Sequence, residues 1–477
     1  MNILFNIITK STIALALMLT AAGCSSSNDE PTPPPSVPLT VVKTSIANGS
    51  EVPVSTQQIS IEYSHPIALS NGANITLNNN VVAPKVSNKT LTIDLTLEEG
   101  IAYTLNLPKG SVVRKDDNNV KAETLVITFK TPDPVKPSNF EPLTNKNATT
   151  QAQNVYAFLL SQYGTKTLSG AMANVNNNND FANLIASTTG KHPALTGYDF
   201  IHLAYSPANW IDYSNIEAAK TQWQNNGLVS YMWHWAVPPT QGAKIEDYSF
   251  SANNGFDIRE ALKAGTWQNQ QLLADIQKVA GYLKLLQDAG IPVIWRPLHE
   301  AAGNYNYDGK NAAWFWWGDK GGEYTKQLWI LLHDKLVKEY NLNNLIWVWT
   351  VQYREGFEAD ALAAYPGNEY VDLVATDIYA PNTDSKLTEY NFINNNVTRG
   401  KKMIALAECG NIPNPAKTFS AGDTWSWFMV WYSRDSAGKV TINDPADDKF
   451  KYNTNTYWTS VLTNANIINR EDMPNLK

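Results

Sequence analysis

The chain has 477 residues, of which 43% are hydrophobic and 17% are charged. This composition supplies a large core and excludes wholesale disorder, and at ~150 residues per domain the length predicts two or three domains. The net charge of -7 excludes a basic nucleic-acid-binding protein, and cysteines at positions 24 and 409 alone exclude a disulfide framework. The 16 Trp favour a flat, ring-shaped ligand such as a sugar, although Trp also fills cores.

Residues 1–23 predict an export signal, with Lys10 supplying positive charge and residues 11–22 an apolar stretch too short to span a bilayer. Residues 19–24 (LTAAGC) resemble a bacterial lipobox, in which cleavage before Cys24 leaves a lipidated N-terminus. The alternative is an ordinary signal peptide. We expect a lipid anchor at Cys24 in the outer membrane of a Gram-negative bacterium, at the cell surface or facing the periplasm. Residues 24–38 are Ser/Pro-rich and predict an extended tether.

Residues 39–131 predict a small all-β domain. Short β-branched runs with period-two alternation, separated by Asn and Gly, indicate an antiparallel sandwich. The runs lie at 58–63, 74–77, 90–95, 103–107 and 124–129. With Gly100, residues 103–105 and residues 108–110, the segment resembles a bacterial immunoglobulin-like domain. It contains no Trp, so a spacer is favoured over a glycan-binding module, and residues 132–140 form a second linker.

Residues 141–477 predict an α/β fold, a (β/α)8 TIM barrel. Eight apolar runs alternate with longer amphipathic stretches, of which residues 272–286 give the clearest helical pattern. In this fold the C-terminal ends of the strands carry the functional side chains. The runs lie near 167–172, 192–198, 228–235, 292–298, 344–350, 370–379, 402–407 and 424–431.

The ends of these runs carry two carboxylates among aromatic residues. The fourth run ends in His299 and Glu300, the sixth in Asp377 and Tyr379, and the seventh delivers Glu408. Glycosidic cleavage needs one carboxyl group to protonate the leaving oxygen and a second to attack the anomeric carbon or activate water. If runs four and seven face each other, a separation of ~5 Å would give the retaining geometry.

Five motifs resemble glycoside hydrolase family 26, the endo-β-1,4-mannanases. The motifs are WRPLHE at 295–300, WFWWG at 314–318, DIY at 377–379, AE at 407–408 and FMVW at 428–431. The resemblance covers residues 140–474. It implies a retaining endo-β-1,4-mannanase that hydrolyses mannan, glucomannan or galactomannan by double displacement, without a cofactor.

The resemblance also implies roles for individual residues. Glu300 is expected to be the general acid/base and Glu408 the nucleophile, with Tyr379 donating a hydrogen bond to Glu408. The other expected substrate-binding residues are His234, His299, Trp314 and Trp431; Arg434 is a further candidate from its place just beyond the eighth run. The remaining histidines (65, 192, 202 and 333) show no paired spacing for a metal, so we expect none.

Elementary electrostatics predicts opposite protonation states for the two carboxyl groups. Apolar surroundings and the negative charge of Glu408 should raise the pKa of Glu300, whereas Tyr379 and Arg296 are candidate donors that keep Glu408 ionised. The segment 301–313 is longer than the corresponding connection in many family members. Its length leaves open which residues bind the sugars on the leaving-group side of the cleaved bond, and whether Trp314 is one of them.

Two alternatives remain open: the same mechanism on a xylan or β-glucan, and a non-catalytic, lipid-anchored glycan-binding protein. The latter predicts the loss of one strand-end carboxylate, and both are present. A monomer is the family expectation.

Overall fold

A computed structural model describes residues 37–54, 56–98, 100–131, 140–174, 176–301, 313–435 and 437–477. The chain divides into two compact units, built mainly from residues 37–130 and from residues 131–477. Cys24, the signal peptide, nearly all of the tether and the linker, and residues 302–312 lie outside the described ranges. In the described part of the chain, no helix has the length and apolar character needed to cross a membrane.

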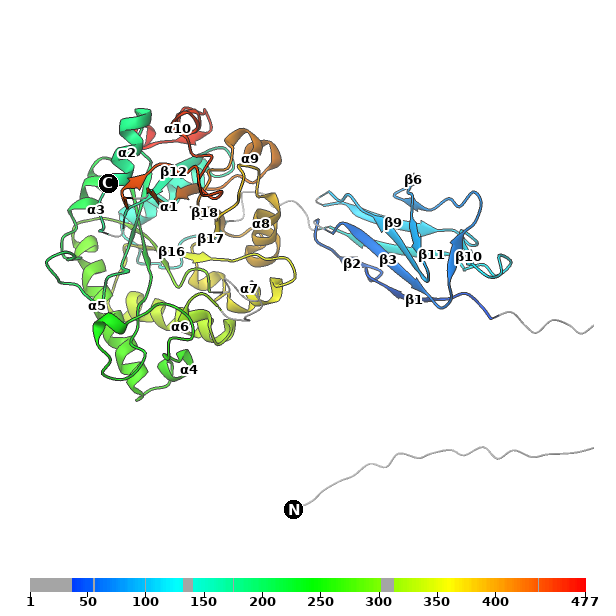
Figure 1. The fold of residues 1–477 in the computed structure, drawn as a ribbon, viewed down its shortest axis with the longest axis horizontal. Helices are drawn as coiled ribbons and strands as arrows, with labels where there is room; N and C mark the ends of the chain where they lie inside the picture. The colour runs from blue at the N-terminus through cyan, green and yellow to red at the C-terminus, as the bar shows by residue number, and fades with distance from the viewer. Residues whose placement is uncertain are drawn as a thin grey trace, which may run out of the picture. The chain divides into compact units, whose positions relative to one another are not determined.

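The first unit is an antiparallel β-structure, as predicted. One sheet has the order β1-β3-β8-β7, a second has the order β2-β11-β9-β5-β6, and β10 pairs with β4 (Figure 1). Buried and exposed residues alternate along β3 and β9, because one face of each sheet covers the core. The strands are β1 (Val41–Thr44), β2 (Ser50–Glu51), β3 (Gln58–Tyr63), β4 (Ile67–Leu69), β5 (Thr76–Leu77), β6 (Asn80–Val81), β7 (Lys85–Ser87), β8 (Thr90–Asp94), β9 (Ala102–Leu107), β10 (Val112–Arg114) and β11 (Leu125–Lys130).

The second unit is the predicted barrel. Eight parallel strands follow one another in sheet order from β13 to β19 and then β12, and pairing of β12 with β13 closes the ring. Each of the eight predicted runs overlaps one strand, and nearly every strand residue is buried. The strands are β12 (Thr167–Met172), β13 (Leu195–Asp199), β14 (Leu228–Trp233), β15 (Val293–Pro297), β16 (Leu345–Thr350), β17 (Leu373–Ile378), β18 (Met403–Cys409) and β19 (Trp427–Val430).

Helices surround these strands (Figure 1). The α-helices are α1 (Thr150–Gln162), α2 (Asp180–Thr189), α3 (Glu217–Gln224), α4 (Ile258–Ala261), α5 (Trp267–Asp288), α6 (Gly322–Asp334), α7 (Glu358–Ala364), α8 (Leu387–Phe392), α9 (Pro415–Ala421) and α10 (Asn455–Leu462). The π-helical turns Lys335–Glu339 and Ile393–Thr398 extend α6 and α8. Short 3-10 turns lie at Ile245–Asp247, Trp316–Gly318, Asn368–Tyr370 and Arg470–Asp472.

Helix α5 illustrates how the sequence selects these helices. The Thr266 side chain caps its first turn by accepting from the Asn269 N–H at 3.1 Å. Leu272, Ile276 and Leu283 recur at helical spacing and are fully buried. Gln277 and Lys284 are exposed on the other side of the helix, whereas Asp275 faces inward and accepts from the Trp235 indole at 2.9 Å. Helix α5 thus covers the barrel with a mostly apolar face.

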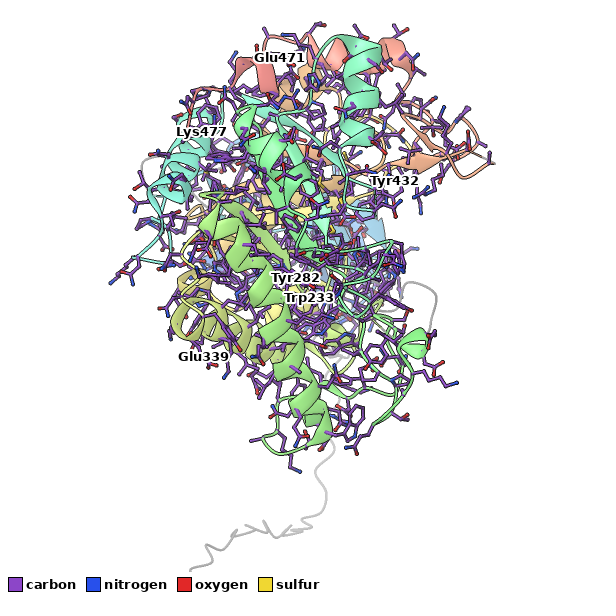
Figure 2. All side chains as sticks on the ribbon, turned by 90° about the vertical axis from the view of Figure 1, so that its left-hand side faces the viewer. Trp233, Tyr282, Glu339, Tyr432, Glu471 and Lys477 are labelled. Atoms are coloured by element: carbon purple, nitrogen blue, oxygen red, sulfur yellow. The ribbon has the colours of Figure 1, made fainter. Side chains whose placement is uncertain are left out.

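The two ends of the barrel can be identified from labelled residues. Glu339 precedes β16 and Lys477 ends the chain, and both lie on the left in Figure 2. Tyr432 follows β19 and lies on the right. The strands therefore end on the right, which is the side where a (β/α)8 barrel carries its functional residues.

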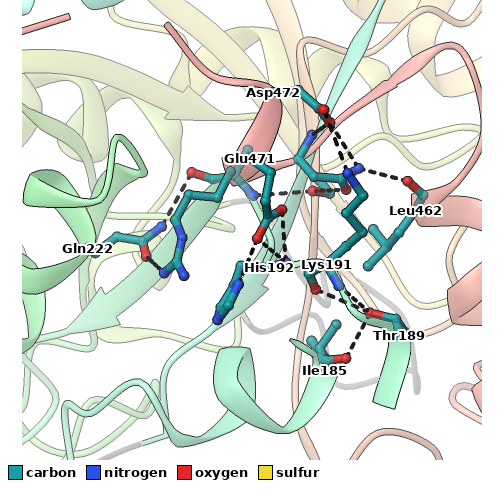
Figure 3. A network of polar contacts seen from close by, with 12 residues as sticks. Ile185, Thr189, Lys191, His192, Gln222, Leu462, Glu471 and Asp472 are labelled. Atoms are coloured by element: carbon teal, nitrogen blue, oxygen red, sulfur yellow. Dashed lines mark hydrogen bonds and ion pairs between the residues drawn. The ribbon is translucent and has the colours of Figure 1, made fainter. Parts of the chain in front are cut away.

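The opposite end of the barrel is closed by the C-terminal segment. Strand β22 (Ile467–Ile468) pairs with Thr167 and Leu168 at the start of β12, whereas β13 pairs with β12 from Gly170 onward. The backbone N–H of His192 and its ring nitrogen Nδ1 both contact the Glu471 carboxylate, the latter at 2.7 Å (Figure 3). The segment thus fills the gap where β12 and β13 diverge.

Asn469 fixes this segment through its buried side chain. Its Oδ1 accepts from the Ser169 hydroxyl at 3.0 Å, and its Nδ2 donates to the Leu462 carbonyl at 2.7 Å. Asn469→Ala leaves the buried Leu462 carbonyl without this donor, whereas the Ser169 hydroxyl keeps the Ile468 carbonyl as an acceptor at 3.1 Å. We therefore expect the substitution to lower the free energy of unfolding by about 2 kcal/mol. Urea unfolding checks this value. The exposed Asn475→Ala is the control, and equal stability of the two variants would contradict the role of Asn469.

Candidate active site

Glu300 follows β15 on a segment with unusual backbone geometry. Leu298 and Glu300 both have φ of 51°, in the left-handed region that costs a non-glycine residue ~1 kcal/mol or more. The Trp317 indole N–H donates to the carbonyl of His299 at 2.9 Å and holds this segment in place. The strained backbone therefore sets the position from which Glu300 enters the barrel mouth.

Glu408 lies within β18 and is 5% exposed. Its Oε1 accepts from the Arg296 guanidinium, and its Oε2 accepts from the Tyr379 hydroxyl at 2.7 Å. Both predicted donors are thus in contact with this carboxyl group. Two donors, one of them cationic, therefore hold this carboxyl group at both of its oxygens.

Arg296 connects four strands beneath the site and is 2% exposed. Besides Glu408, it donates through Nη1 to Asp377 Oδ2 at 2.8 Å and to Thr350 Oγ1 at 3.1 Å. Burial lowers the pKa of Arg296, but the charges of Asp377 and Glu408 outweigh burial and raise it overall. The guanidinium therefore remains charged and fixes the spacing of the two carboxyl groups. Burial, opposed by the charge of Arg296, raises the pKa of Asp377 to about 8.

Glu300 is 7% exposed, and its pKa is raised well above the ordinary value. Burial is the largest cause, followed by the negative charges of Asp377 and Glu408, while Arg296 opposes the shift. The direction is the predicted one, with Asp377 as an additional cause. Gln352 Nε2 donates to Glu300 Oε1 at 2.6 Å. The site thus pairs a carboxyl group with a raised pKa, Glu300, with a carboxyl group that two donors hold, Glu408.

Two histidines lie beside these carboxyl groups. His234 Nδ1 is 2.5 Å from Asp199 Oδ2, and His234 Nε2 is 3.2 Å from His299 Nε2. Burial lowers the pKa of His234, but the charge of Asp199 and its hydrogen bond raise it overall. The pKa of His299 is held well below its usual value by burial and by the charges of His234 and Arg296. The two rings are thus joined through their Nε2 atoms, and the opposite pKa shifts make His234 the more basic of the two.

The two tryptophans expected to bind substrate, Trp431 and Trp314, lie in different surroundings. The Trp431 ring lies 6.1 Å from His234 and stacks with Tyr432 at 5.8 Å, so it borders the mouth. Trp314 is 40% exposed, and its neighbour Phe315 is the one that packs against His299, at 5.0 Å.

Arg434 is exposed on a hairpin of β20 (Ser433–Arg434) and β21 (Val440–Thr441). Its guanidinium lies 5.0 Å from the Tyr432 ring, and it donates to the Gly438 carbonyl at 2.7 Å. The structure therefore joins His234, His299, Glu300, Tyr379, Glu408 and Trp431 by direct contacts or shared partners, whereas Arg434 and Trp314 lie farther along the loops.

The sequence reasoning missed Asp199, Gln352 and Phe315. Asp199 is the last residue of β13, and Gln352 follows β16 by two positions. Their place at strand ends was an available signal, because the C-terminal ends of parallel strands converge in a barrel. Phe315 carried no signal apart from its neighbour Trp314.

Among the residues with described positions, no three or more His, Cys, Asp or Glu side chains are grouped so that they could hold a metal ion. Cys409 is buried, and burial together with the charges of Glu408 and Asp377 raises the pKa of its thiol. Cys409 is therefore a thiol that stays protonated behind Glu408.

The fold and this arrangement of carboxyl groups define the class of (β/α)8 glycoside hydrolases. Residues 144–457 match the sequence profile of glycosyl hydrolase family 26, and residues 35–131 match that of a bacterial Ig-like domain. The chain belongs to glycosyl hydrolase family 26.

Two curated relatives carry the name mannan endo-1,4-beta-mannosidase. The protein from Thermothelomyces thermophilus is 35% identical over 317 residues, which cover 65% of this chain and 60% of the relative. Mannan endo-1,4-beta-mannosidase B from a Piromyces species is 30% identical over 341 residues, covering 70% of this chain and 53% of the relative. The chain thus spans between half and two thirds of the length of these relatives.

Solved structures show the same fold. The family 26 domain of an endo-beta-mannanase/endo-beta-glucanase from Prevotella bryantii has a TM-score of 0.60 and 33% identity, covering 70% of this chain and 99% of that domain. A beta-mannanase from a symbiotic protist of the termite Reticulitermes speratus, complexed with gluco-manno-oligosaccharide, has a TM-score of 0.60 and 30% identity. The match covers 71% of this chain and 99% of that chain.

Proposed function

We propose that the protein is a retaining endo-β-1,4-mannanase. The observation that carries this proposal is the pair of buried carboxyl groups at the barrel mouth, in which the pKa of Glu300 is raised and Glu408 accepts from Arg296 and Tyr379. Glycoside hydrolysis with either stereochemical outcome requires one protonated and one ionised carboxyl group, and we infer retention from membership of family 26. The mannanase names of the relatives support a β-mannan as the substrate.

In the first step, Glu408 attacks the anomeric carbon while Glu300 transfers its proton to the leaving oxygen. A glycosyl ester forms at Glu408, and the glycosidic bond breaks. Esterification removes the negative charge of Glu408, which is one cause of the raised pKa of Glu300. Glu300, now a carboxylate, takes a proton from water as the water oxygen attacks the anomeric carbon, and Glu408 leaves as a carboxylate.

The neighbouring side chains support these two steps. The Tyr379 hydroxyl and Arg296 hold Glu408 at both oxygens, so its attacking geometry is set before the substrate arrives. His234 and Trp431 border the mouth, where we assign them contacts with the sugar bound before the cleaved bond. Aromatic rings bind the apolar faces of sugars.

Product analysis tests the substrate assignment. The purified protein is incubated with linear mannan, glucomannan, galactomannan, xylan and mixed-linkage β-glucan. We expect oligosaccharides of many lengths at early times from the mannans, and NMR of the first products should show the β-anomer. Cleavage of xylan or β-glucan instead would show that the substrate is not a β-mannan. Binding without cleavage would support a non-catalytic glycan-binding protein.

We further propose that the protein is a monomeric lipoprotein of the outer membrane, anchored through Cys24. The lipobox-like residues 19–24 and the tether after them support this assignment. We expect Cys24→Ser to move the protein from the membrane fraction to the soluble fraction and to abolish labelling by radioactive palmitate. Retention of Cys24→Ser in the membrane would contradict the anchor. Protease treatment of intact cells distinguishes a surface location from a periplasmic one.

A further inference from the structure

Gln352 lies at the barrel mouth just beyond β16. Thr350 ends the strand and accepts from Arg296 at 3.1 Å. Val351 extends the ladder by donating its N–H to the Ala375 carbonyl at 2.7 Å, and its side chain is buried. Because side chains alternate along an extended strand, Gln352 faces the same side as Thr350, which is the side of the active site.

The Gln352 amide contacts the carboxyl group of Glu300 directly. Its Nε2 lies 2.6 Å from Glu300 Oε1. The backbone of Glu300 is fixed by its left-handed conformation and by the bond from Trp317 to the preceding carbonyl. With the backbone fixed, the amide determines the rotation of the carboxyl group about its last side-chain bond.

We propose that Gln352 is a positioning residue that determines which oxygen of Glu300 carries the catalytic proton, an inference that rests on the proposed hydrolase function. An amide N–H group can donate but cannot accept, so Oε1 receives a hydrogen bond in both protonation states of Glu300. The proton given to the leaving oxygen therefore resides on Oε2. In the second step, Oε2 takes the proton from water.

The same hydrogen bond limits the rise in the pKa of Glu300. A donated hydrogen bond stabilises a carboxylate more than a carboxylic acid. Burial and the charges of Asp377 and Glu408 raise this pKa, and Arg296 lowers it. The titratable and charged groups that interact with Glu300 are Arg296, Asp377, Tyr379 and Glu408, and His299 precedes it in the chain. A side-chain hydrogen bond with Asp377 also raises the pKa of Glu300. Gln352 adds an uncharged donor, so Glu300 can still ionise in the second step.

Gln352→Met tests the inference, because methionine has a similar length and no donor. We expect kcat/KM on β-mannan to fall about 10- to 100-fold, a part of the usual contribution of acid–base catalysis. The alkaline limb of the pH profile of kcat/KM should move to higher pH, since loss of the donor raises the pKa of Glu300. With 2,4-dinitrophenyl β-mannobioside, whose leaving group needs no protonation, we expect kcat/KM to change less than about threefold.

A matched control removes the same kind of bond elsewhere. Gln271 Nε2 donates to Asp275 Oδ1 at 2.8 Å on α5, and Gln271→Met should leave both kcat/KM values and the pH profile unchanged. An equal loss on both substrates in Gln352→Met, or an unmoved alkaline limb, would overturn the inference.

Carbon-13 NMR titration of Glu300 gives a readout that needs no substrate. We expect the pKa of Glu300 to be higher in Gln352→Met than in the unchanged protein, and equal values would overturn the inference. Failure of the unchanged protein to cleave any tested glycan would instead contradict the proposed function. The two failures are therefore distinguishable.

Discussion

Glu408→Ala is expected to lower kcat on β-mannan by about 10^5-fold, because the variant has no group to form the glycosyl ester. This loss corresponds to ~7 kcal/mol of transition-state stabilisation. Azide should restore turnover of an aryl β-mannobioside. It would occupy the space of the carboxylate and give the α-glycosyl azide, so the configuration of this product identifies the face from which Glu408 attacks.

Controls separate catalysis from folding in this experiment. Glu408→Gln keeps an acceptor for Arg296 and Tyr379, so its thermal unfolding should match that of the unchanged protein while its activity is lost. Glu339→Ala removes a carboxylate at the opposite end of the barrel (Figure 2) and should leave kcat unchanged. Substantial mannan hydrolysis by Glu408→Ala would contradict the nucleophile assignment.

Glu300→Ala is expected to lower kcat/KM on β-mannan by about 10^3-fold, because the leaving oxygen then departs without a proton. The loss should nearly vanish in kcat/KM for an aryl β-mannobioside with a nitrophenolate leaving group. Azide should now attack the glycosyl ester from the opposite face and give the β-glycosyl azide. In the unchanged protein, activity on mannan should fall as pH rises through the raised pKa of Glu300.

The outcomes of this experiment discriminate between roles for Glu300. Equal losses on mannan and on the aryl substrate would indicate a binding role rather than acid catalysis. An α-glycosyl azide from Glu300→Ala would indicate that Glu300 is the nucleophile and Glu408 the general acid/base. Either result would require a new assignment of the two carboxyl groups.

The barrel could be predicted from the sequence because its strands are buried on both faces and form continuous apolar runs. Glu300 and Glu408 could be placed at its mouth for the same reason, since parallel strands end on one side. Strand β22 could not be predicted, because two residues carry no periodicity.

The contacts within the site were less accessible to sequence reasoning. Asp199 and Gln352 gain their roles from the partners they contact, His234 and Glu300, and a polar residue after a strand is common in any barrel. The sequence also could not predict which individual aromatic side chains are buried in the site. Trp314 and Phe315 are neighbours in sequence, yet it is Phe315 that packs against the histidines.

The uneven distribution of tryptophan has a spectroscopic consequence. All 16 Trp lie after residue 200, whereas the first unit contains Tyr but no Trp. Emission excited at the red edge of the absorption band, where Tyr does not absorb, therefore reports on the barrel alone. Far-ultraviolet circular dichroism reports on both units. Comparing the two signals during unfolding would show whether the immunoglobulin-like unit and the barrel lose their structure together or in separate transitions.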